Sequence, residues 1–425
     1  MDTHGAVEAV WRIESARVIA GLARMVRDVG LAEELAQDAL VAALEQWPET
    51  GVPRNPGAWL MTIAKRRAVD LFRRNETLGR KLDEIGRAQE QLGEGVLPDL
   101  DAVLDDEHIE DDLLRLVFTA CHPVLSTQAR VALTLRMLGG LTTDEIARAF
   151  LVKESAVAQR IVRAKKTLAD AKVPFEVPTG GERVARVPAV LEVIYLIFNE
   201  GYAATRGDDW MRPALCEDAL RLGRVLAGLM PAEPEVHGLV ALMEIQASRS
   251  AARSGPNGEP VLLMDQNRSR WDRLLIQRGL TALARSETLA DGTYGPYSAQ
   301  AAIAACHAVA LTPEETDWAR IAALYAGLAQ LTPSPVIELN RAVAVSMAEG
   351  PEAGLALVDR LTEEPALKNY HLLPSVRGDF LYKLGRHDEA RAEFERAATM
   401  TGNARERALL LERAESCRKQ EAGIG

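Results

Sequence analysis

The chain has 425 residues, 48% of them hydrophobic and 5% aromatic, and its formal net charge is −11 at pH 7. A chain of this length holds two to four domains, and the lack of any run of about 18 apolar residues excludes a membrane-spanning helix. The four cysteines are scattered without CxxC spacing, which excludes a disulfide scaffold and a cysteine-rich metal site. With many alanines and leucines and few β-rich runs, the sequence predicts an all-α cytoplasmic protein with reduced thiols, no metal and no cofactor.

The charge is distributed unevenly along the chain. Residues 1–75 are neutral in sum, residues 76–112 carry thirteen acidic and three basic side chains, and residues 113–172 carry ten basic and four acidic ones. Nucleic-acid binding needs a local excess of lysine and arginine, and among these three segments residues 113–172 are the one with a net positive charge. The acidic segment 76–107 is predicted to be a flexible, self-repelling linker.

The first clear element is an amphipathic helix over 31–46. Apolar positions such as Leu35 and Ala39 recur at helical spacing and form its buried side. The other face gathers polar side chains, which we expect to be exposed: Glu33, Glu34, Gln37 and Asp38.

A loop rich in proline and glycine, residues 48–57, separates this helix from a second one predicted over 58–74. The second helix begins near Trp59 and carries a basic set: Lys65, Arg66, Arg67, Arg73 and Arg74. An aromatic side chain at the start of a basic helix suits melted DNA, because bases can enter the loop while the basic face holds phosphates. For Trp59 itself, packing in the core is the favoured interpretation, since large aromatic side chains mostly pack.

Residues 141–168 predict two helices around a tight turn. Thr142 and Glu145 have the spacing of a capping box at the start of the first helix, and Ser155 is predicted to cap the second. The second helix has a predicted buried stripe at Val157, Ile161, Ala164 and Leu168. This pattern indicates a helix-turn-helix, which places its second helix in the DNA major groove.

The opposite face of that second helix carries side chains able to read DNA. Glutamine pairs with adenine and arginine with guanine, while lysines near the helix end lie close to phosphates. The side chains concerned are Ala156, Gln159, Arg160, Arg163, Lys165 and Lys166. The alternative is an ordinary amphipathic hairpin with a solvated basic face, and the basic charge concentrated in this part of the chain argues against it.

A segment rich in proline and glycine, residues 173–187, is predicted to be a second linker. Helical patterns then continue to the end of the chain. We expect helices over 188–204, 217–231, 237–253, 267–286, 297–311 and 317–331. Polar clusters such as 199–202 and 294–297 contain no nucleophile, base and orienting group together, so we predict no catalytic residues.

Residues 377–401 match the small and large positions of a tetratricopeptide (TPR) repeat. The matching positions are Gly378, Leu381, Gly385, Ala390, Phe394 and Ala397. A degenerate copy is predicted over 336–361. Because such helix pairs bury their faces only by stacking, we expect a helical-repeat domain over 188–425 with a concave surface for an unidentified protein or peptide ligand.

Taken in order, the acidic helix AEELAQDAL, the Pro/Gly loop, the helix WLMTIAKRRAVDLFRR, the acidic linker and the helix-turn-helix resemble the extracytoplasmic-function (ECF) sigma factors of bacterial RNA polymerase. The resemblance covers residues 6–172. It implies sigma region 2 at 1–75 and region 4 at 108–172. The remainder resembles the extension of a subgroup that carries a long C-terminal TPR-like domain.

The resemblance also implies partners and residue roles. Core RNA polymerase would bind Glu34, Gln37 and Asp38. The minus-ten promoter element would be melted and read by Arg54, Asn55, Trp59, Lys65, Arg66, Arg67, Arg73 and Arg74. The minus-thirty-five element would contact Lys153, Ser155, Ala156, Gln159, Arg160, Arg163, Lys165 and Lys166.

Three hypotheses follow. The first is a sigma factor whose C-terminal domain regulates it in cis through an intramolecular contact with regions 2 and 4. The second is a one-component regulator with a repeat sensor domain, which would not need the 31–74 cluster. The third is a helical-repeat scaffold without DNA binding, against which the +6 net charge of residues 113–172 argues.

Overall fold

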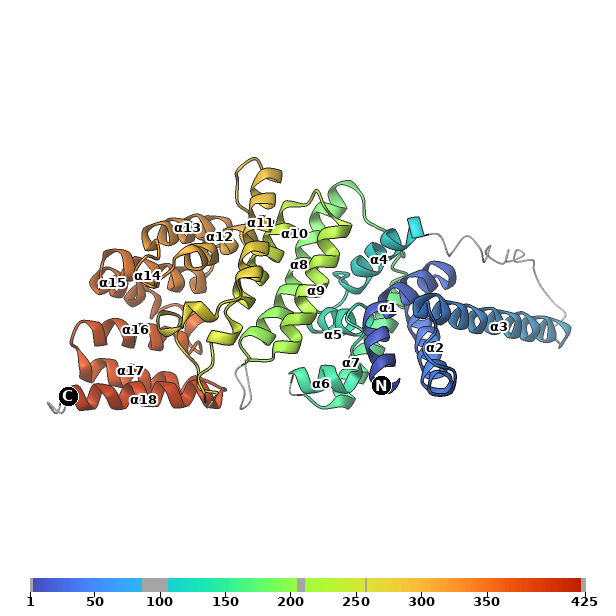
Figure 1. The fold of residues 1–425 in the computed structure, drawn as a ribbon, viewed down its shortest axis with the longest axis horizontal. Helices are drawn as coiled ribbons and strands as arrows, with labels where there is room; N and C mark the ends of the chain where they lie inside the picture. Colours follow the sequence, from blue (N-terminus) through green and yellow to red (C-terminus); the bar gives the residue numbers. More distant parts are fainter. Residues whose placement is uncertain (1–2, 86–105, 151, 205–210, 257, 422–425) are drawn as a thin grey trace. The chain divides into compact units, whose positions relative to one another are not determined.

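A computed structural model describes the chain except for residues 1–2, 86–105, 151, 205–210, 257 and 422–425 (Figure 1). The described residues form helices and loops without a β-strand, apart from one isolated bridge between Ser254 and Pro260. The predicted all-α class is therefore confirmed. Within the described part of the chain, no helix is both long enough and apolar enough to cross a bilayer.

The chain divides into two compact units, residues 1–194 and 195–425. The division falls inside helix α8 (Gly180–Tyr202). Residues 180–187, predicted as linker, are helical, and the helix predicted to begin at 188 begins at Gly180. Pro188 lies inside α8 but is exposed, so its ring does not displace a packed neighbour.

The first unit begins with three helices, α1 (Thr3–Val26), α2 (Val29–Thr50) and α3 (Pro56–Ile85). Asp28 caps α2 by accepting a hydrogen bond from the Leu31 N–H at 2.9 Å, and Gly51, with φ of +80°, ends it. The helix predicted to end at Arg74 continues to Ile85 and extends away from α1 and α2 (Figure 1). The prediction of a flexible linker is therefore wrong for residues 76–85, whose glutamate, leucine, lysine and arginine content favours helix. Residues 86–105 of that linker lie outside the described residues.

Four further helices and the first part of α8 complete this unit. They are α4 (Asp106–Ala120), α5 (Thr127–Met137), α6 (Thr143–Phe150) and α7 (Glu154–Asp170). α1 packs against α4 and α5, and α2 packs against α7. Two groups of helices that are separated in the sequence by the acidic segment therefore lie in direct contact within one unit.

Arg186 of α8 packs on the helices of the same unit. It is 9% exposed, and its guanidinium donates a hydrogen bond to the Phe118 carbonyl oxygen at 2.6 Å. The guanidinium also lies 5.5 Å from the centre of the Phe118 ring, within the range of a cation–π contact. The first unit thus extends past residue 172, the predicted end of the DNA-binding region.

The second unit consists of the end of α8 and a succession of helices that each pack on the next. Its α-helices are α9 (Pro213–Leu229), α10 (Pro234–Ala247), α11 (Arg273–Leu289), α12 (Pro296–Val309), α13 (Trp318–Leu331), α14 (Pro335–Glu349), α15 (Pro351–Leu361), α16 (Leu372–Lys383), α17 (His387–Met400) and α18 (Ala404–Glu421). Short 3-10 turns are η2 (Ser250–Ala252), η3 (Leu263–Asp265), η4 (Arg268–Arg270) and η5 (Pro365–Leu367). α10 is buried on nearly all sides, because α9, α11 and α12 surround it.

The last helices form stacked pairs with close approaches at small residues. α16 packs on α17 and α17 on α18, as the red end of the ribbon shows in Figure 1. Phe394 is 1% exposed, and a Cβ atom added to Gly378 would lie 2.9 Å from its ring. Gly385, with φ of +75°, makes the turn between α16 and α17, a backbone conformation that favours glycine.

Candidate functional site

The helix-turn-helix has the predicted capping box. The Glu145 N–H donates to the Thr142 hydroxyl at 3.1 Å, and the Thr142 N–H donates to the Glu145 carboxylate at 2.8 Å. The second helix, α7, begins at Glu154 with Lys153 as its N-cap, so the prediction of Ser155 as the cap is wrong. Lys153 is the last residue with extended backbone, with ψ of 138°, so the helix starts two residues before the position that a cap at Ser155 implies.

α7 separates a buried stripe from an exposed polar face. Val157, Ile161, Ala164 and Leu168 are all buried, as predicted. Arg160 is half-buried, whereas Lys153, Ser155, Ala156, Gln159, Arg163 and Lys166 are exposed. Lys166 makes an exposed ion pair with Asp170 at 3.2 Å, a contact of little energetic weight. Most of the predicted DNA-reading side chains therefore share one accessible face.

Lys165 does not belong to that face. Its side chain is 15% exposed, and its ammonium lies 2.6 Å from the Glu33 carboxylate and 3.4 Å from that of Glu34. The expectation of a phosphate contact from Lys165 is corrected accordingly. The physical reason is that Lys165 follows the buried Ala164 at the edge of the stripe, where α2 packs against α7.

Glu33 lies at the centre of this contact rather than on the exposed face predicted for it. Its side chain is 5% exposed and receives the Arg136 guanidinium at 2.9 Å as well as Lys165. Gln37 of α2 also donates a hydrogen bond to Glu33. One buried carboxylate of α2 is thus held by two cations from α5 and α7.

A second ion pair joins α1 to the start of α6. The Arg12 guanidinium lies 2.5 Å from the Glu145 carboxylate, the same group that completes the capping box. Burial by itself would raise the pKa of Glu145, but the Thr142 N–H and the Arg12 guanidinium outweigh it and hold the pKa below its usual value. Glu145 is therefore ionised near neutral pH and ties α6 to α1.

The residues implied for polymerase binding lie on one side of α2. Glu34 and Asp38 are exposed and Gln37 is half-buried. Asp38 makes an ion pair with Arg67 of α3 at 3.0 Å. This ion pair joins a residue implied in polymerase binding to a residue implied in binding the minus-ten element.

The residues implied for the minus-ten element divide between exposed and buried positions. Arg54, Asn55, Arg66 and Arg73 are exposed, Trp59 and Arg67 are half-buried, and the side chain of Arg74 lies outside the described residues. Trp59 packs edge-on against the buried Trp47, with ring centres 5.3 Å apart, so part of its ring is covered as the core interpretation predicted.

Lys65 and Asn55 have local structural roles. Lys65 is 7% exposed and lies beside the buried stripe of Leu60, Ala64 and Ala68, so it is not on the accessible basic face predicted for it. The Asn55 side-chain oxygen accepts a hydrogen bond from the Ala58 N–H at 3.1 Å and thereby caps the first turn of α3. The remaining part of its amide is available to a ligand.

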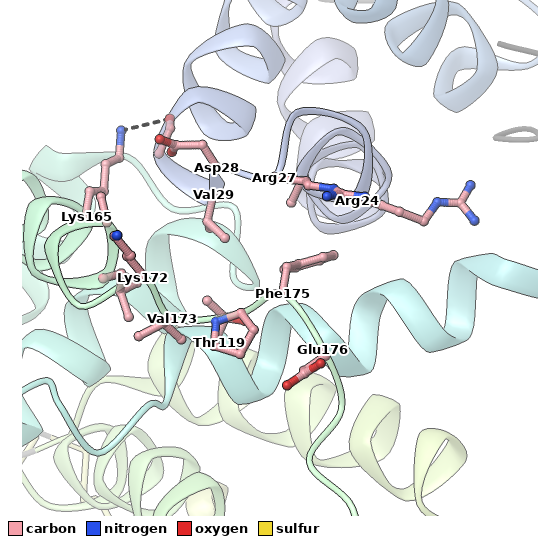
Figure 2. A pocket seen from close by; sticks show the side chains of 15 residues that line it. Arg24, Arg27, Asp28, Val29, Thr119, Lys165, Lys172, Val173, Phe175 and Glu176 are labelled. Atoms are coloured by element: carbon pink, nitrogen blue, oxygen red, sulfur yellow. Dashed lines mark hydrogen bonds between the residues drawn. The ribbon is translucent and has the colours of Figure 1, made fainter. Parts of the chain in front are cut away.

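A cavity of about 660 Å³ lies in the first unit, and Lys165, the partner of Glu33, is one of the residues that line it (Figure 2). The corner between α1 and α2, the end of α7 and residues 172–176 line it, and Phe175 projects toward that corner in Figure 2. Its cationic lining comes from Arg24, Arg27, Lys165 and Lys172. Asp28 and Glu176 line it as well, so the charge of the cavity is mixed.

All four cysteines are buried, and none forms a disulfide among the described residues. Among the residues with described positions, no three His, Cys, Asp or Glu side chains gather as a metal site.

Comparisons with known proteins agree with the order of these elements. Residues 12–77 match Sigma-70 region 2 and residues 115–168 match Sigma-70 region 4. Residues 186–287 match a family of unknown function (DUF6596), which begins within α8.

The chain is also similar to three proteins along much of their length. It is 45% identical over 401 residues to an uncharacterized protein of Rhizobium meliloti (strain 1021), covering 93% of this chain and 92% of that protein. It is 31% identical over 160 residues to the ECF RNA polymerase sigma factor SigK of Mycobacterium sp. (strain KMS), covering 37% of this chain and 77% of that protein. The ECF RNA polymerase sigma factor SigK of Mycobacterium ulcerans (strain Agy99) is 30% identical over 156 residues, covering 36% of this chain and 78% of that protein.

Proposed function

The chain belongs to the ECF sigma factors of bacterial RNA polymerase, and we propose that it carries out promoter recognition through the exposed faces of α2, α3 and α7. The observation that carries this proposal is the accessible row of Ser155, Gln159 and Arg163 on α7, whose opposite side is the buried stripe. Lys153, Ala156, Arg160 and Lys166 flank that row in the minus-thirty-five contact. The protein acts without covalent chemistry, in the cytoplasm, where core polymerase and promoter DNA are its partners.

The proposed contacts in the region 2 part use exposed or half-buried side chains. Glu34, Gln37 and Asp38 dock on core polymerase, and Arg54, Asn55, Trp59, Arg66, Arg67 and Arg73 contact the minus-ten element. Arg74 is assigned to the same element from its place in the basic set of the sequence alone. Lys65 is buried and is therefore left out of the proposed DNA contacts. The half-buried Trp59 ring is the stacking surface for a melted base, since one edge is fixed by Trp47.

Binding both promoter elements requires the first unit to open. The minus-ten and minus-thirty-five elements are separated by about 25 base pairs, which is about 85 Å of B-form DNA. Lys165 of α7, however, lies 2.6 Å from Glu33 of α2. We propose that the Glu33 contact holds a closed state that separates when polymerase and promoter bind.

DNA binding by α7 provides one test. We expect Arg163→Ala to weaken binding of a minus-thirty-five duplex by about 1–3 kcal/mol and to relax preference at one base pair, because arginine reads guanine edges. Lys166→Ala should weaken matched and shuffled duplexes equally and reduce the salt slope by about 1. Fluorescence anisotropy between roughly 50 and 200 mM salt measures both quantities.

Arg148→Ala is the matched control for these variants, because Arg148 is exposed on α6 and is paired with Asp144 at 2.9 Å. It should leave affinity and preference nearly unchanged. Equal losses of affinity in all three variants would contradict the assignment of α7 as the reading helix.

Transcription separates the sigma factor from a one-component regulator. Run-off transcription with core polymerase should depend on the protein, and Asp38→Arg should abolish it by reversing charge on the α2 face and breaking the Arg67 pair. Because Arg67 is also assigned to the minus-ten element, Arg67→Ala controls for loss of that pair in an assay of core-polymerase binding without DNA, where it should bind nearly as the unmodified protein does and Asp38→Arg should not. Intact duplex binding with no transcript from the unmodified protein would favour the one-component regulator.

We further propose that the helices after α8 form a TPR-like domain that regulates the sigma regions in cis. The features that support it are the close packing of Gly378 on Phe394 and the glycine turn between α16 and α17. Gly350, with φ of +110°, makes the corresponding turn between α14 and α15 of the degenerate copy.

Truncation tests regulation in cis. A chain ending at Ile194 keeps the first compact unit with Arg186 on Phe118, whereas one ending at residue 175 loses that contact. We expect the 1–194 protein to differ from the full chain in promoter-dependent transcription, and the direction of the change gives the sign of regulation. Equal transcription rates, with helical content retained by circular dichroism, would refute regulation in cis.

A further inference from the structure

A second cavity, of about 230 Å³, lies wholly within the second unit and is separate from the proposed promoter and polymerase faces. The end of α8, helices α10, α12, α13 and α14, Arg249 after α10 and the turn η3 line it. Its polar lining consists of Gln246, Arg249, Gln300, His307, Asn340 and the hydroxyls of Tyr195 and Tyr325. The remainder is mostly aliphatic, as in sites that bind small molecules.

Arg249 is the one guanidinium that lines this cavity. Its Nη2 donates hydrogen bonds to the Tyr202 hydroxyl and to the Gln246 side-chain oxygen, both of them neutral acceptors. Within the described part of the chain, no carboxylate lies within ion-pairing distance of Arg249. Because a guanidinium has five N–H donors, Arg249 retains donors for a ligand.

The surroundings of Arg249 add positive charge. Arg268 is 5% exposed and donates to the carbonyl oxygens of His307 and Ala310 at 2.9 and 2.7 Å. Burial lowers the pKa of Arg268, and nearby Glu314 and Glu315, which do not line the cavity, act in the opposite direction. A buried cation with neutral partners favours an anion in the adjoining space.

His307 adds an unused hydrogen-bonding group to the lining. It is 9% exposed, and its Nδ1 has no hydrogen-bond partner among the residues described. Burial, Arg249 and Arg268 lower the pKa of His307 to about 3, so the ring is neutral at pH 7. A buried polar atom without a partner costs free energy, which a bound ligand recovers.

We propose that this cavity binds a small carboxylate of amino-acid size, with its charge paired to Arg249 and its polar groups bound by the side-chain amides and His307. A single lining guanidinium matches a monoanion and forms a two-pronged pair with a carboxylate. Liquid water occupies about 30 Å³ per molecule, so 230 Å³ accommodates roughly eight non-hydrogen atoms. Phosphate is a poorer match, because among the described residues no second cation lines the cavity.

Ligand binding to the full chain tests the proposal directly. The probes are the twenty L-amino acids, pyruvate and succinate, each at 5 mM, with inorganic phosphate and the amides of the amino acids as comparison compounds. We expect at least one carboxylate to raise the thermal unfolding temperature and to give a saturable calorimetric titration, while its amide does not bind. No binding by any carboxylate, equal binding by an amide, or tighter binding by phosphate would overturn the proposal.

Two variants connect binding to the cavity. Arg249→Gln should weaken the carboxylate about 10- to 100-fold, as expected for loss of a charged hydrogen bond. Ala304→Leu, which puts a larger side chain at a buried lining position, should abolish binding without removing a charge. Arg278→Gln, an exposed arginine on α11, is the control for loss of charge and should bind as the unmodified chain does.

The variants also keep the test conclusive if one of them misfolds. Circular dichroism identifies a misfolded variant, and the other then decides the location of the site. Unchanged affinity in a folded Arg249→Gln or Ala304→Leu protein would overturn the assignment to this cavity. Because only binding is measured, the result is independent of whether the chain directs transcription.

Discussion

We expect Glu33→Gln to destabilise the contact between α2 and α7 by about 3 kcal/mol, at the lower end of the roughly 3–5 kcal/mol lost when one partner of a buried ion pair is removed. Glu33 is 5% exposed, whereas its partners Arg136 and Lys165 are each 15% exposed. The amide keeps the shape of the side chain but leaves two neighbouring cations without their carboxylate. The slight exposure of the partners lets water relieve part of the cost.

The distance between α2 and α7 is the appropriate measurement. Cysteines introduced at the exposed positions Glu49 and Ala156 can carry fluorescent dyes, because all four natural cysteines are buried. A loss of about 3 kcal/mol corresponds to an increase of about 100-fold in the ratio of open to closed protein. Energy transfer between the dyes should therefore fall in Glu33→Gln.

Glu34→Gln is the matched control for this substitution. Glu34 is the next residue along the chain, and its carboxylate lies 3.4 Å from the same Lys165 ammonium. Because the Glu34 side chain is 70% exposed, we expect it to stabilise the contact between α2 and α7 by less than about 1 kcal/mol. If the two substitutions changed energy transfer equally, Glu33 would not be the residue that holds the closed state. If Glu33→Gln opened the unit without increasing polymerase binding, the closed state would not limit access.

A local sequence pattern is sufficient to predict features that depend on neighbouring residues, but not the contacts between distant segments. Spacing alone identified the buried stripe of α7 and the capping box of Thr142 and Glu145, because both depend on residues within one or two helical turns. Glu33 and Lys165 were predicted to be exposed because charged side chains usually are. Their burial depends on α2 meeting α7, a contact between segments more than 130 positions apart.

The ends of the helices were predicted less well, for a different reason. Acidic composition suggested a linker after Arg74, yet the same glutamate, lysine and leucine residues are good helix formers, and α3 continues to Ile85. The prolines and glycines of 173–187 suggested a break, yet α8 begins at Gly180. The cavity at Arg249 had no signal in the sequence, because its lining comes from separate stretches of the chain spread between Tyr195 and Asn340.

The stacked pairs at the end of the chain lead to the other large expected effect. Phe394→Ala should destabilise α16, α17 and α18 by about 3–5 kcal/mol, since the ring is fully buried and its removal leaves a cavity. Hydrogen exchange measured on peptides from these helices reports the local opening free energy without requiring the whole chain to unfold in one step. Phe394→Leu gives a smaller loss of the same kind if the alanine variant does not fold.

Gly378→Ala distinguishes specific pairing from general loss of apolar burial. In the unmodified chain the added methyl group would lie 2.9 Å from the Phe394 ring and 3.2 Å from the Ala390 carbonyl oxygen, so we expect net destabilisation. In Phe394→Ala the ring is absent, and the substitution should stabilise α16 by up to about 1 kcal/mol, the helix preference of alanine over glycine. The sign of the effect should therefore reverse between the two backgrounds.

Gly327→Ala on α13 is the control for this reversal, because nothing lies within 4 Å of the added methyl group. It should stabilise its helix equally with or without Phe394. Coupling between Gly378 and Phe394 is expected only if α16 and α17 approach through this residue pair, as in a TPR hairpin. If Gly378→Ala had the same effect in both backgrounds, the two helices would not depend on this contact, and the TPR-like assignment of the last helices would lose its main physical support.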